Sequence, residues 1–311
     1  MAETLTDKNW DEHYIRRGNP VEPTYYIISH KSESAGLFYR FIHVAGHIRH
    51  ALFNGWLPVV DMQNYPNPYL PPEKLGKENS WEYYFEQPLR IGLEQAYNGA
   101  NVILSNANEI LPRPTWAMPF YENNNNICTE WRMLIKLGLL KIKPAIMQEI
   151  ATVREKLFNP NDRVLGVLLR GTDYVAKKLK WHPIPPPVEF ALSTVVAKLK
   201  EWNCNKIFLA TEDKSIVKAF KNVFRNTCII LDREYVDYKV PGQAVGLVRI
   251  DRPNDHFIQG KDYLTQMVLL STCNDFVAAR CSGSVAVMLL EKSFEHTYFF
   301  NLGRYGVITL D

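Results

Sequence analysis

From residue 162 onward, short apolar runs alternate with longer amphipathic stretches, and this alternation constrains the fold more than any other feature of the sequence. Apolar runs that predict strands occur at 163–170, 206–211, 227–232, 275–280 and 296–301. Helical patterns occupy 187–202, 213–224, 262–273 and 282–293. Such alternation with short connections predicts an α/β fold, here a doubly wound domain around a parallel sheet.

The first half begins in the same way but is less regular. A strand at 25–30, a loop that ends in Gly36, a helix at 37–53 and a strand at 57–62 predict a second Rossmann-like unit. Prolines and aromatic residues interrupt the pattern between 63 and 119, where we expect a long surface excursion around one strand at 101–106. Residues 130–158 predict two helices that meet near Pro144, and the asparagine run 123–126 predicts a solvated loop. We place the domain boundary after these helices, which gives domains of residues 1–158 and 159–311.

Charge and cysteine content exclude several classes of partner. Lys and Arg total 36 against 33 Asp and Glu, so the net charge of +3 is too small to indicate a nucleic-acid-binding protein. The five cysteines form no C-x-x-C pair, and we expect buried free thiols rather than disulfides or a zinc site. The first twenty residues are polar, and the longest apolar run near the start, 25–29, is too short to span a bilayer. We therefore expect a cytoplasmic protein, with peripheral association with a membrane left open.

Polar residues follow the predicted strands of the second domain at the points where ligands bind in open parallel sheets. Three loops carry them: Arg170, Gly171, Thr172 and Asp173; then Thr211, Glu212 and Asp213; then Ser282, Gly283 and Ser284. Small residues at a helix start allow backbone amides to approach an anion, and an arginine at a strand end can bind the same anion. Two structural alternatives stay open: the serines cap the helix, and Arg170 pairs with Asp173 or Glu212.

Several well-known active-site motifs are absent from the sequence. It contains no G-x-x-x-x-G-K-[ST] and no G-x-G-x-x-G after the first strand, which disfavours nucleoside-triphosphate hydrolysis and dinucleotide redox chemistry. It also lacks G-x-S-x-G and H-E-x-x-H, so a hydrolase has no support.

Four stretches resemble, in order and spacing, motifs of the fucosyltransferase superfamily: VLGVLLRGTDY, HPIPPPVEF, IFLATEDKSIVKAF and DFVAARCSGSVAVMLLE. That superfamily includes the α-1,6-, α-1,2- and protein O-fucosyltransferases. The resemblance covers residues 163–301. It departs from the α-1,6 pattern at Leu168, where the family has a histidine, and at Gly171, where the family has a second arginine.

The resemblance implies a GT-B fold, with two facing Rossmann-like domains, and GDP-fucose as the donor bound by the second domain. Carried over to this sequence, Arg170 binds the β-phosphate and Glu212 or Asp213 lies at the nucleotide. The residues that wrap the phosphates are Ser282, Gly283, Ser284 and Val285. Two alternatives remain: a transferase for another nucleotide sugar, such as a GDP-linked heptose or deoxyhexose, and a non-catalytic glycan-binding protein of the same fold.

Transfer of a sugar from a nucleotide diphosphate requires stabilisation of the leaving phosphate, which an arginine and helix-start amides supply. The sequence has no Asp-x-Asp motif, so we expect a metal-independent, inverting transfer without a cofactor to a glycan acceptor, in a bacterium a polysaccharide. The base that accepts the acceptor proton should come from the first domain. The candidates, each of which also has a structural interpretation, are His30, Glu33, His43 and Asp61. The loop at Gly36 is the expected contact with donor or acceptor.

Overall fold

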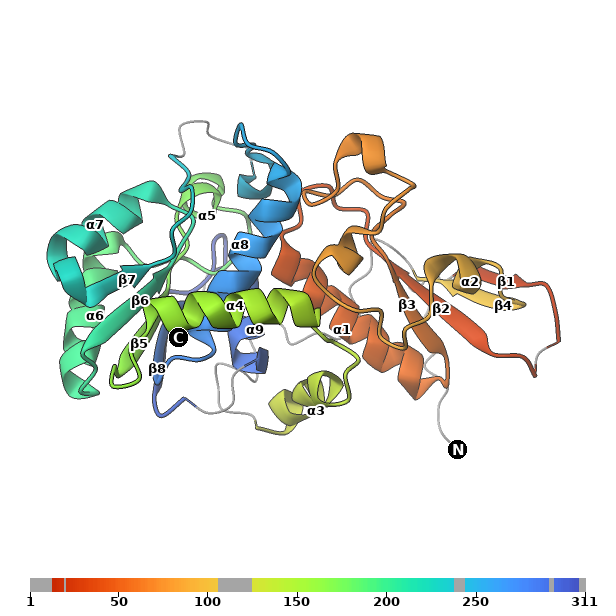
Figure 1. Ribbon diagram of the computed structural model, residues 1–311, viewed down its shortest axis with the longest axis horizontal. Helices are drawn as coiled ribbons and strands as arrows, with labels where there is room; N and C mark the ends of the chain where they lie inside the picture. Colours follow the sequence, from red (N-terminus) through yellow and green to blue (C-terminus); the bar gives the residue numbers. More distant parts are fainter. Residues whose placement is uncertain (1–12, 20, 106–124, 238–243, 291–293, 308–311) are drawn as a thin grey trace. The chain divides into compact units, whose positions relative to one another are not determined.

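The computed structural model describes residues 13–19, 21–105, 125–237, 244–290 and 294–307 (Figure 1). Within this part, the side chains of residues 13, 125–128, 130, 173 and 174 are not described. The chain divides into two compact units, unit 1 (Met1–Arg113 and Thr129–Lys143) and unit 2 (Pro114–Cys128 and Pro144–Asp311). The division lies at Lys143 and Pro144, whereas the sequence places the boundary at 158/159, at the end of the helix that starts with Pro144.

Unit 1 is built on a four-stranded sheet in the order β1-β4-β2-β3, in which only β1 is antiparallel to its neighbour. Its elements are β1 (His13–Arg16), β2 (Thr24–Ser29), α1 (Leu37–Phe53), β3 (Leu57–Asp61), the 3₁₀ helices η1 (Pro72–Lys74) and η2 (Ser80–Tyr83), α2 (Leu93–Tyr97) and β4 (Asn101–Leu104). α3 (Asn125–Lys136) follows. Strand residues alternate between two faces, so Tyr26 contacts α1 while Ile27 and Val59 pack against α2.

The aromatic stretch before α2 is part of the core of unit 1. Trp81, Tyr84 and Phe85 are fully buried, and the rings of Trp81 and Phe85 stack at 4.3 Å. Phe41 of α1 packs against both rings. The predicted surface excursion is therefore wrong for residues 81–85, because these rings cover the apolar side of α1. Its later, proline-rich part at 111–119 lies outside the described residues.

Unit 2 contains a five-stranded, fully parallel sheet in the order β7-β6-β5-β8-β9. Its elements are α4 (Pro144–Leu157), β5 (Val164–Leu168), α5 (Thr172–Lys177), α6 (Val188–Glu201), β6 (Lys206–Ala210), α7 (Lys214–Phe224), η3 (Arg225–Thr227), β7 (Cys228–Ile230), η4 (Val245–Leu247), α8 (Asp255–Leu270), β8 (Asp275–Ala279), α9 (Ser282–Leu290) and β9 (Thr297–Phe300). Among the described residues, no helix has the length and apolar content needed to cross a bilayer.

Helices cover both faces of the sheet of unit 2 (Figure 1). Leu165 and Val167 of β5 pack against α6 and α7 in one apolar cluster. The alternate residues, Gly166 and Leu168, face α8 and α9. A Cβ on Gly166 would lie 3.1 Å from the side chain of Leu270, so the glycine allows α8 to pack closely on β5. The three-layer arrangement buries the sheet between its helices.

Candidate functional site

The strand order of unit 2 marks the place where a ligand would bind. β5 lies at the centre, and the chain proceeds to β6 and β7 on one side and to β8 and β9 on the other. The loops after β5 and β8 therefore leave the carboxyl edge of the sheet in opposite directions, which is the arrangement that forms ligand crevices in Rossmann-like folds. Arg170 follows β5, and Ser282 follows β8. The structure brings these two sequence-predicted loops together.

The loop after β5 is held by the glutamate that follows β6. Glu212 Oε1 accepts hydrogen bonds from the Gly171 amide (3.1 Å) and the Thr172 hydroxyl (2.9 Å). The same oxygen lies 3.4 Å from Nε of Arg170, whose side chain is 15% exposed. Glu212 therefore positions the Nε edge of the Arg170 guanidinium while the side chain keeps access to solvent. The side chain of Asp173, the fourth predicted residue of this loop, lies outside the described part of the structure.

Gly171 is set against Asp213 so closely that a side chain has no room. A Cβ at position 171 would lie 2.2 Å from Oδ2 of Asp213 and 2.9 Å from its Cβ. Asp213 cannot easily withdraw, because its carboxylate caps α7 through the amides of Ser215 and Ile216 and accepts a further bond from the Thr172 amide. Thr172 has φ +47°, an uncommon conformation for a β-branched residue. The tight contact gives a physical reason for glycine at this position.

Thr211, the first residue of the loop after β6, is buried and also structural. Its hydroxyl accepts from the Asp213 amide (3.2 Å), and its carbonyl accepts from the side chain of Gln266 on α8 (3.3 Å).

The loop after β8 is shaped by Ser284, which is fully buried. The Ser284 hydroxyl donates to the Cys281 carbonyl (2.8 Å) and accepts from the Cys281 amide (3.0 Å). Gly283 lets α9 pack closely, since a Cβ there would lie 2.8 Å from the hydroxyl of Tyr263. Ser284 and Gly283 thus shape the turn, and Val285 is buried behind it. Ser282, at the start of α9, is 7% exposed.

Arg170 and Cys281 follow the ends of β5 and β8, which are adjacent strands of the sheet. Burial raises the pKa of this thiol, and the guanidinium of Arg170 acts in the opposite direction by favouring the thiolate. Arg170 therefore lies within electrostatic reach of the start of α9. A guanidinium and the amides of a helix start form the kind of environment that binds phosphate.

The structure shows two further arginines beside α8, of which Arg233 was not among the residues selected from the sequence. Arg233 follows β7, and its guanidinium contacts the side chains of Gln266 (3.2 Å) and Asp262 (3.8 Å) on α8. Arg252 contacts Asp262 (3.5 Å) and Asp255 (2.7 Å). Burial raises the pKa of Asp262, against the opposing effect of both arginines. The strand-end rule would have found Arg233, because it follows β7 as Arg170 follows β5.

In unit 1, the adjacent strands β2 and β3 bring His30 and Asp61 to the same sheet edge, but both side chains are engaged in local structure. Asp61 is fully buried and accepts from the amides of Gln63 (2.8 Å) and Asn64 (3.1 Å) and from the hydroxyl of Tyr97 (2.6 Å). Burial, followed by the charge of Asp61, raises the pKa of Tyr97. The carboxylate of Asp61 thus stabilises the turn after β3.

Three imidazoles form a buried row behind the loop after β2. The ring centroids of His30 and His43 lie 4.6 Å apart, and those of His43 and His47 lie 4.3 Å apart. Nδ1 of His30 accepts from the Ser32 amide (3.2 Å), so in the neutral ring the proton is on Nε2. Nε2 of His43 donates to the Ser29 carbonyl (3.0 Å). Through these bonds, Nδ1 of His30 and Nε2 of His43 hold the backbone in place.

Arg40 fixes the loop that carries Glu33 and Gly36. This residue of α1 is 1% exposed, and its guanidinium donates to the carbonyls of His30 (3.3 Å), Ser32 and Ala35 (3.2 Å). Burial lowers the pKa of Arg40 to about 10. Gly36 precedes α1 as its N-cap residue, and Glu33 is exposed. Among the four proposed bases, Glu33 is the one whose side chain faces solvent.

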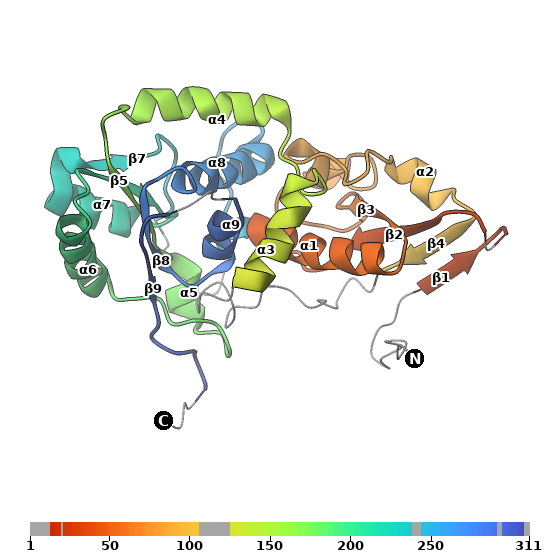
Figure 2. The same cartoon turned by 90° about the horizontal axis from the view of Figure 1, so that it is seen from below.

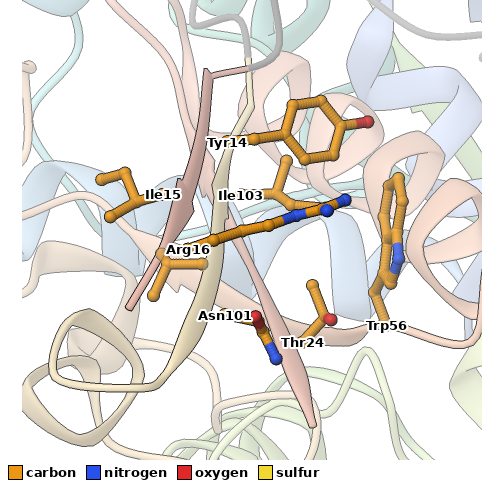
Figure 3. A pocket seen from close by; sticks show the side chains of 8 residues that line it. Tyr14, Ile15, Arg16, Thr24, Trp56, Asn101 and Ile103 are labelled. Carbon is orange, nitrogen blue, oxygen red and sulfur yellow. The ribbon is translucent and has the colours of Figure 1, made fainter. Parts of the chain in front are cut away.

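A small pocket in unit 1 lies at the other end of the strands (Figure 3). Its volume is about 130 Å³, and Tyr14, Arg16 and Trp56 surround it above Thr24 and Asn101. Thr24 and Asn101 are the first residues of β2 and β4. The pocket therefore belongs to the amino edge of the sheet and is separate from the loops that contain Glu33 and Asp61.

At the level of sequence, no protein-family model and no curated protein matches the chain. Its structure is similar to that of NodZ α-1,6-fucosyltransferase soaked with GDP-fucose, with a TM-score of 0.52 at 15% identity over 86% of this chain and 93% of that chain. For the selenomethionine form of fucosyltransferase NodZ from Bradyrhizobium the TM-score is 0.53 at 15% identity, over 91% of this chain and 97% of that chain. POFUT1 in complex with GDP-fucose has a TM-score of 0.40 at 12% identity, over 92% and 74% of the two chains. The predicted α/β fold is confirmed, and this chain has the fold of the GT-B fucosyltransferase NodZ.

Proposed function

We propose that this chain is a glycosyltransferase that transfers fucose from GDP-fucose to a hydroxyl of a glycan. The observation that carries the proposal is that Arg170 and the start of α9 follow the adjacent central strands β5 and β8 at the carboxyl edge of the sheet of unit 2. Crystals of NodZ, which shares this fold, have been soaked with GDP-fucose, and NodZ has been co-crystallised with GDP. The superfamily motifs at residues 163–301 lie on the same loops.

The chemistry assigned to these residues is stabilisation of the leaving group. As the bond between the sugar and the β-phosphate breaks, negative charge builds on the phosphate. Arg170, fixed by Glu212, would donate to that oxygen, and the amides at Ser282 and Gly283 would add the partial positive charge of a helix start. The acceptor hydroxyl attacks the anomeric carbon and loses its proton to a base. We assign that role to Glu33, and expect inversion at the anomeric carbon without a metal ion.

Calorimetric titration with GDP tests the donor site. Arg170→Ala removes the charge-assisted bonds to the diphosphate, and we expect affinity to fall about 10–100-fold with the melting temperature nearly unchanged. Arg154→Ala is the matched control, because Arg154 lies exposed on α4, where its Nε donates to the hydroxyl of Thr272 (3.3 Å). Equal GDP affinity in Arg170→Ala and the parent protein would overturn the assignment. Tighter binding of UDP or CMP than of GDP would overturn fucose as the donor sugar.

Glu33→Gln tests the base separately from binding. We expect turnover with GDP-fucose and acceptor to fall about 10²–10⁴-fold while GDP affinity stays unchanged. Glu73→Gln, an exposed glutamate of η1 in the same unit, is the control. Normal turnover in Glu33→Gln would exclude Glu33. Binding of GDP-fucose by the parent protein without transfer or hydrolysis would favour the non-catalytic alternative.

A further inference from the structure

The surface at the end of α5 combines large apolar side chains with basic ones. Val175 and Leu179 are 48% exposed and Trp181 is 56% exposed. Lysines stand between them in the sequence VAKKLKW. We call the following residues the α5 patch: Val175, Lys178, Leu179, Lys180, Trp181 and Arg304.

The backbone of the α5 patch is anchored, so the exposure of Trp181 is a property of the fold. The Trp181 amide donates to the Tyr305 carbonyl (2.9 Å), and the Tyr305 amide donates to the His182 carbonyl (3.0 Å). Pro183 and Arg304 form an antiparallel bridge. Figure 2 shows the chain after β9 running beside the segment that follows α5. Trp181 is thus presented on a turn that is fixed at both sides.

The two segments that form the α5 patch contain basic residues and no acidic ones. The sequence of residues 175–184 and 301–307 contains Lys177, Lys178, Lys180 and Arg304 and no Asp or Glu. These four basic residues lie in two short segments of a chain whose net charge is only +3. The ammonium of Lys180 lies 5.5 Å from the ring centroid of Trp181, which places charge and ring at the same surface.

This combination of exposed apolar side chains and lysines favours a lipid surface over a protein partner. The cores of protein interfaces are depleted in lysine, whereas lysines here separate the exposed apolar residues. At a bilayer, tryptophan lies at the level of the headgroups and lysines reach anionic lipids through flexible stems. We propose that the α5 patch binds the surface of an anionic membrane. The proposal goes beyond the donor reaction and does not depend on it.

The position of the patch gives such binding a consequence for the site. α5 starts directly after Gly171 and has six residues, about 9 Å of helix. Membrane contact at its far end would hold the loop of Arg170 close to the lipid surface. An acceptor attached to a lipid would then meet the protein at the edge of unit 2 that carries Arg170.

Sedimentation with vesicles tests the proposal on the full chain. We use vesicles of phosphatidylcholine alone and of phosphatidylcholine with about 30% phosphatidylglycerol, a proportion chosen to give a clearly negative surface. We expect binding only to the anionic vesicles, with loss of binding at high salt. Lys178→Asn with Lys180→Gln should lower the partition coefficient about 25-fold, since each lysine near such a surface contributes roughly fivefold. Asparagine at 178 retains the left-handed backbone found there.

The matched control is Lys218→Gln with Lys221→Gln on α7, which removes the same charge from exposed positions of the same unit. Its binding should stay within about twofold of the parent protein. Trp181→Asn should also abolish the blue shift of tryptophan emission that anionic vesicles cause. Thermal melting verifies that each variant is folded. Failure of the parent protein to bind anionic vesicles, equal binding to neutral vesicles, or equal losses in the two lysine variants would overturn the proposal.

Discussion

At the scale of single residues, the contact between Gly171 and Asp213 gives a reason for the glycine at 171, where the chain departs from the α-1,6 pattern. The sequence shows that glycine stands at 171 in place of the second arginine of that pattern, but it cannot show the reason for this difference. The structure gives the reason, because Asp213 caps α7 and occupies the space that any side chain at 171 would need. Arg170 and Glu212 were predictable from their position at strand ends. The sequence also left open that Arg170 pairs with Asp173 or Glu212, and the structure shows the pair with Glu212.

Gly171→Ala tests this contact. The added Cβ would overlap the carboxylate of Asp213, so we expect a loss of about 1–3 kcal/mol in the free energy of unfolding. Gly92→Ala is the control, since Gly92 is also an N-cap residue with ordinary φ and open space around it. Its cost should be about 0.5 kcal/mol. Urea unfolding measures both, and an equal cost at the two positions would contradict the proposed overlap.

At the scale of elements, the sequence predicts the helices and strands that have a clear hydrophobic period and misses those that depend on packing. α1 begins and ends where predicted, and the helices on either side of Pro144 are confirmed as α3 and α4. β1, α2 and α5 were missed because four to six residues are too few to establish a period. α8 starts at Asp255 rather than 262 because its first turns are polar. α3 includes Asn125 and Asn126, so the predicted loop is wrong for these two residues.

Arg40 shows why the loop after β2 could not be predicted. Within the helical pattern it is one of several polar residues, and only the fold places three carbonyls around it. Arg40→Met keeps much of the volume but leaves one buried and two partly buried carbonyls without their donor. We expect a loss of about 3 kcal/mol in the free energy of unfolding, measured by urea denaturation. Arg49→Met, at an exposed position of the same helix, should have little effect. An equally small loss in Arg40→Met would show that the bonds of Arg40 to the three carbonyls, which we call the clamp, contribute little to stability.

At the scale of the whole molecule, the thiols link stability to pH. Cys204, Cys228, Cys273 and Cys281 are free. The prediction of buried free thiols is confirmed for Cys204, Cys273 and Cys281, whereas Cys228 is only partly buried. Burial raises the pKa of Cys204 from 9.0 to about 12, with a smaller effect of its bond to Asp275, and burial raises that of Cys228 to about 11. The folded state therefore keeps protons that the unfolded state releases above pH 9.

The direction in which stability changes with pH follows from these two pKa shifts. Because the folded pKa values are the higher ones, their contribution to stability is complete below pH 9 and is lost as pH rises toward 11–12. We expect the free energy of unfolding, measured in urea, to decrease between pH 8 and pH 10. Cys204→Ser retains a donor for Asp275 but does not titrate, so its decrease should be smaller. An identical pH dependence in the variant would exclude Cys204 as a contributor.

The clamp formed by Arg40 has a further consequence for ligand binding. A loop that must become ordered when its ligand arrives loses affinity to the entropy of ordering. Here the carbonyls of residues 30, 32 and 35 are already held by a buried side chain, so the ordering has taken place when unit 1 folds. Whatever binds beside Glu33 would meet a preorganised backbone, and its association would carry a small entropic penalty and little conformational delay.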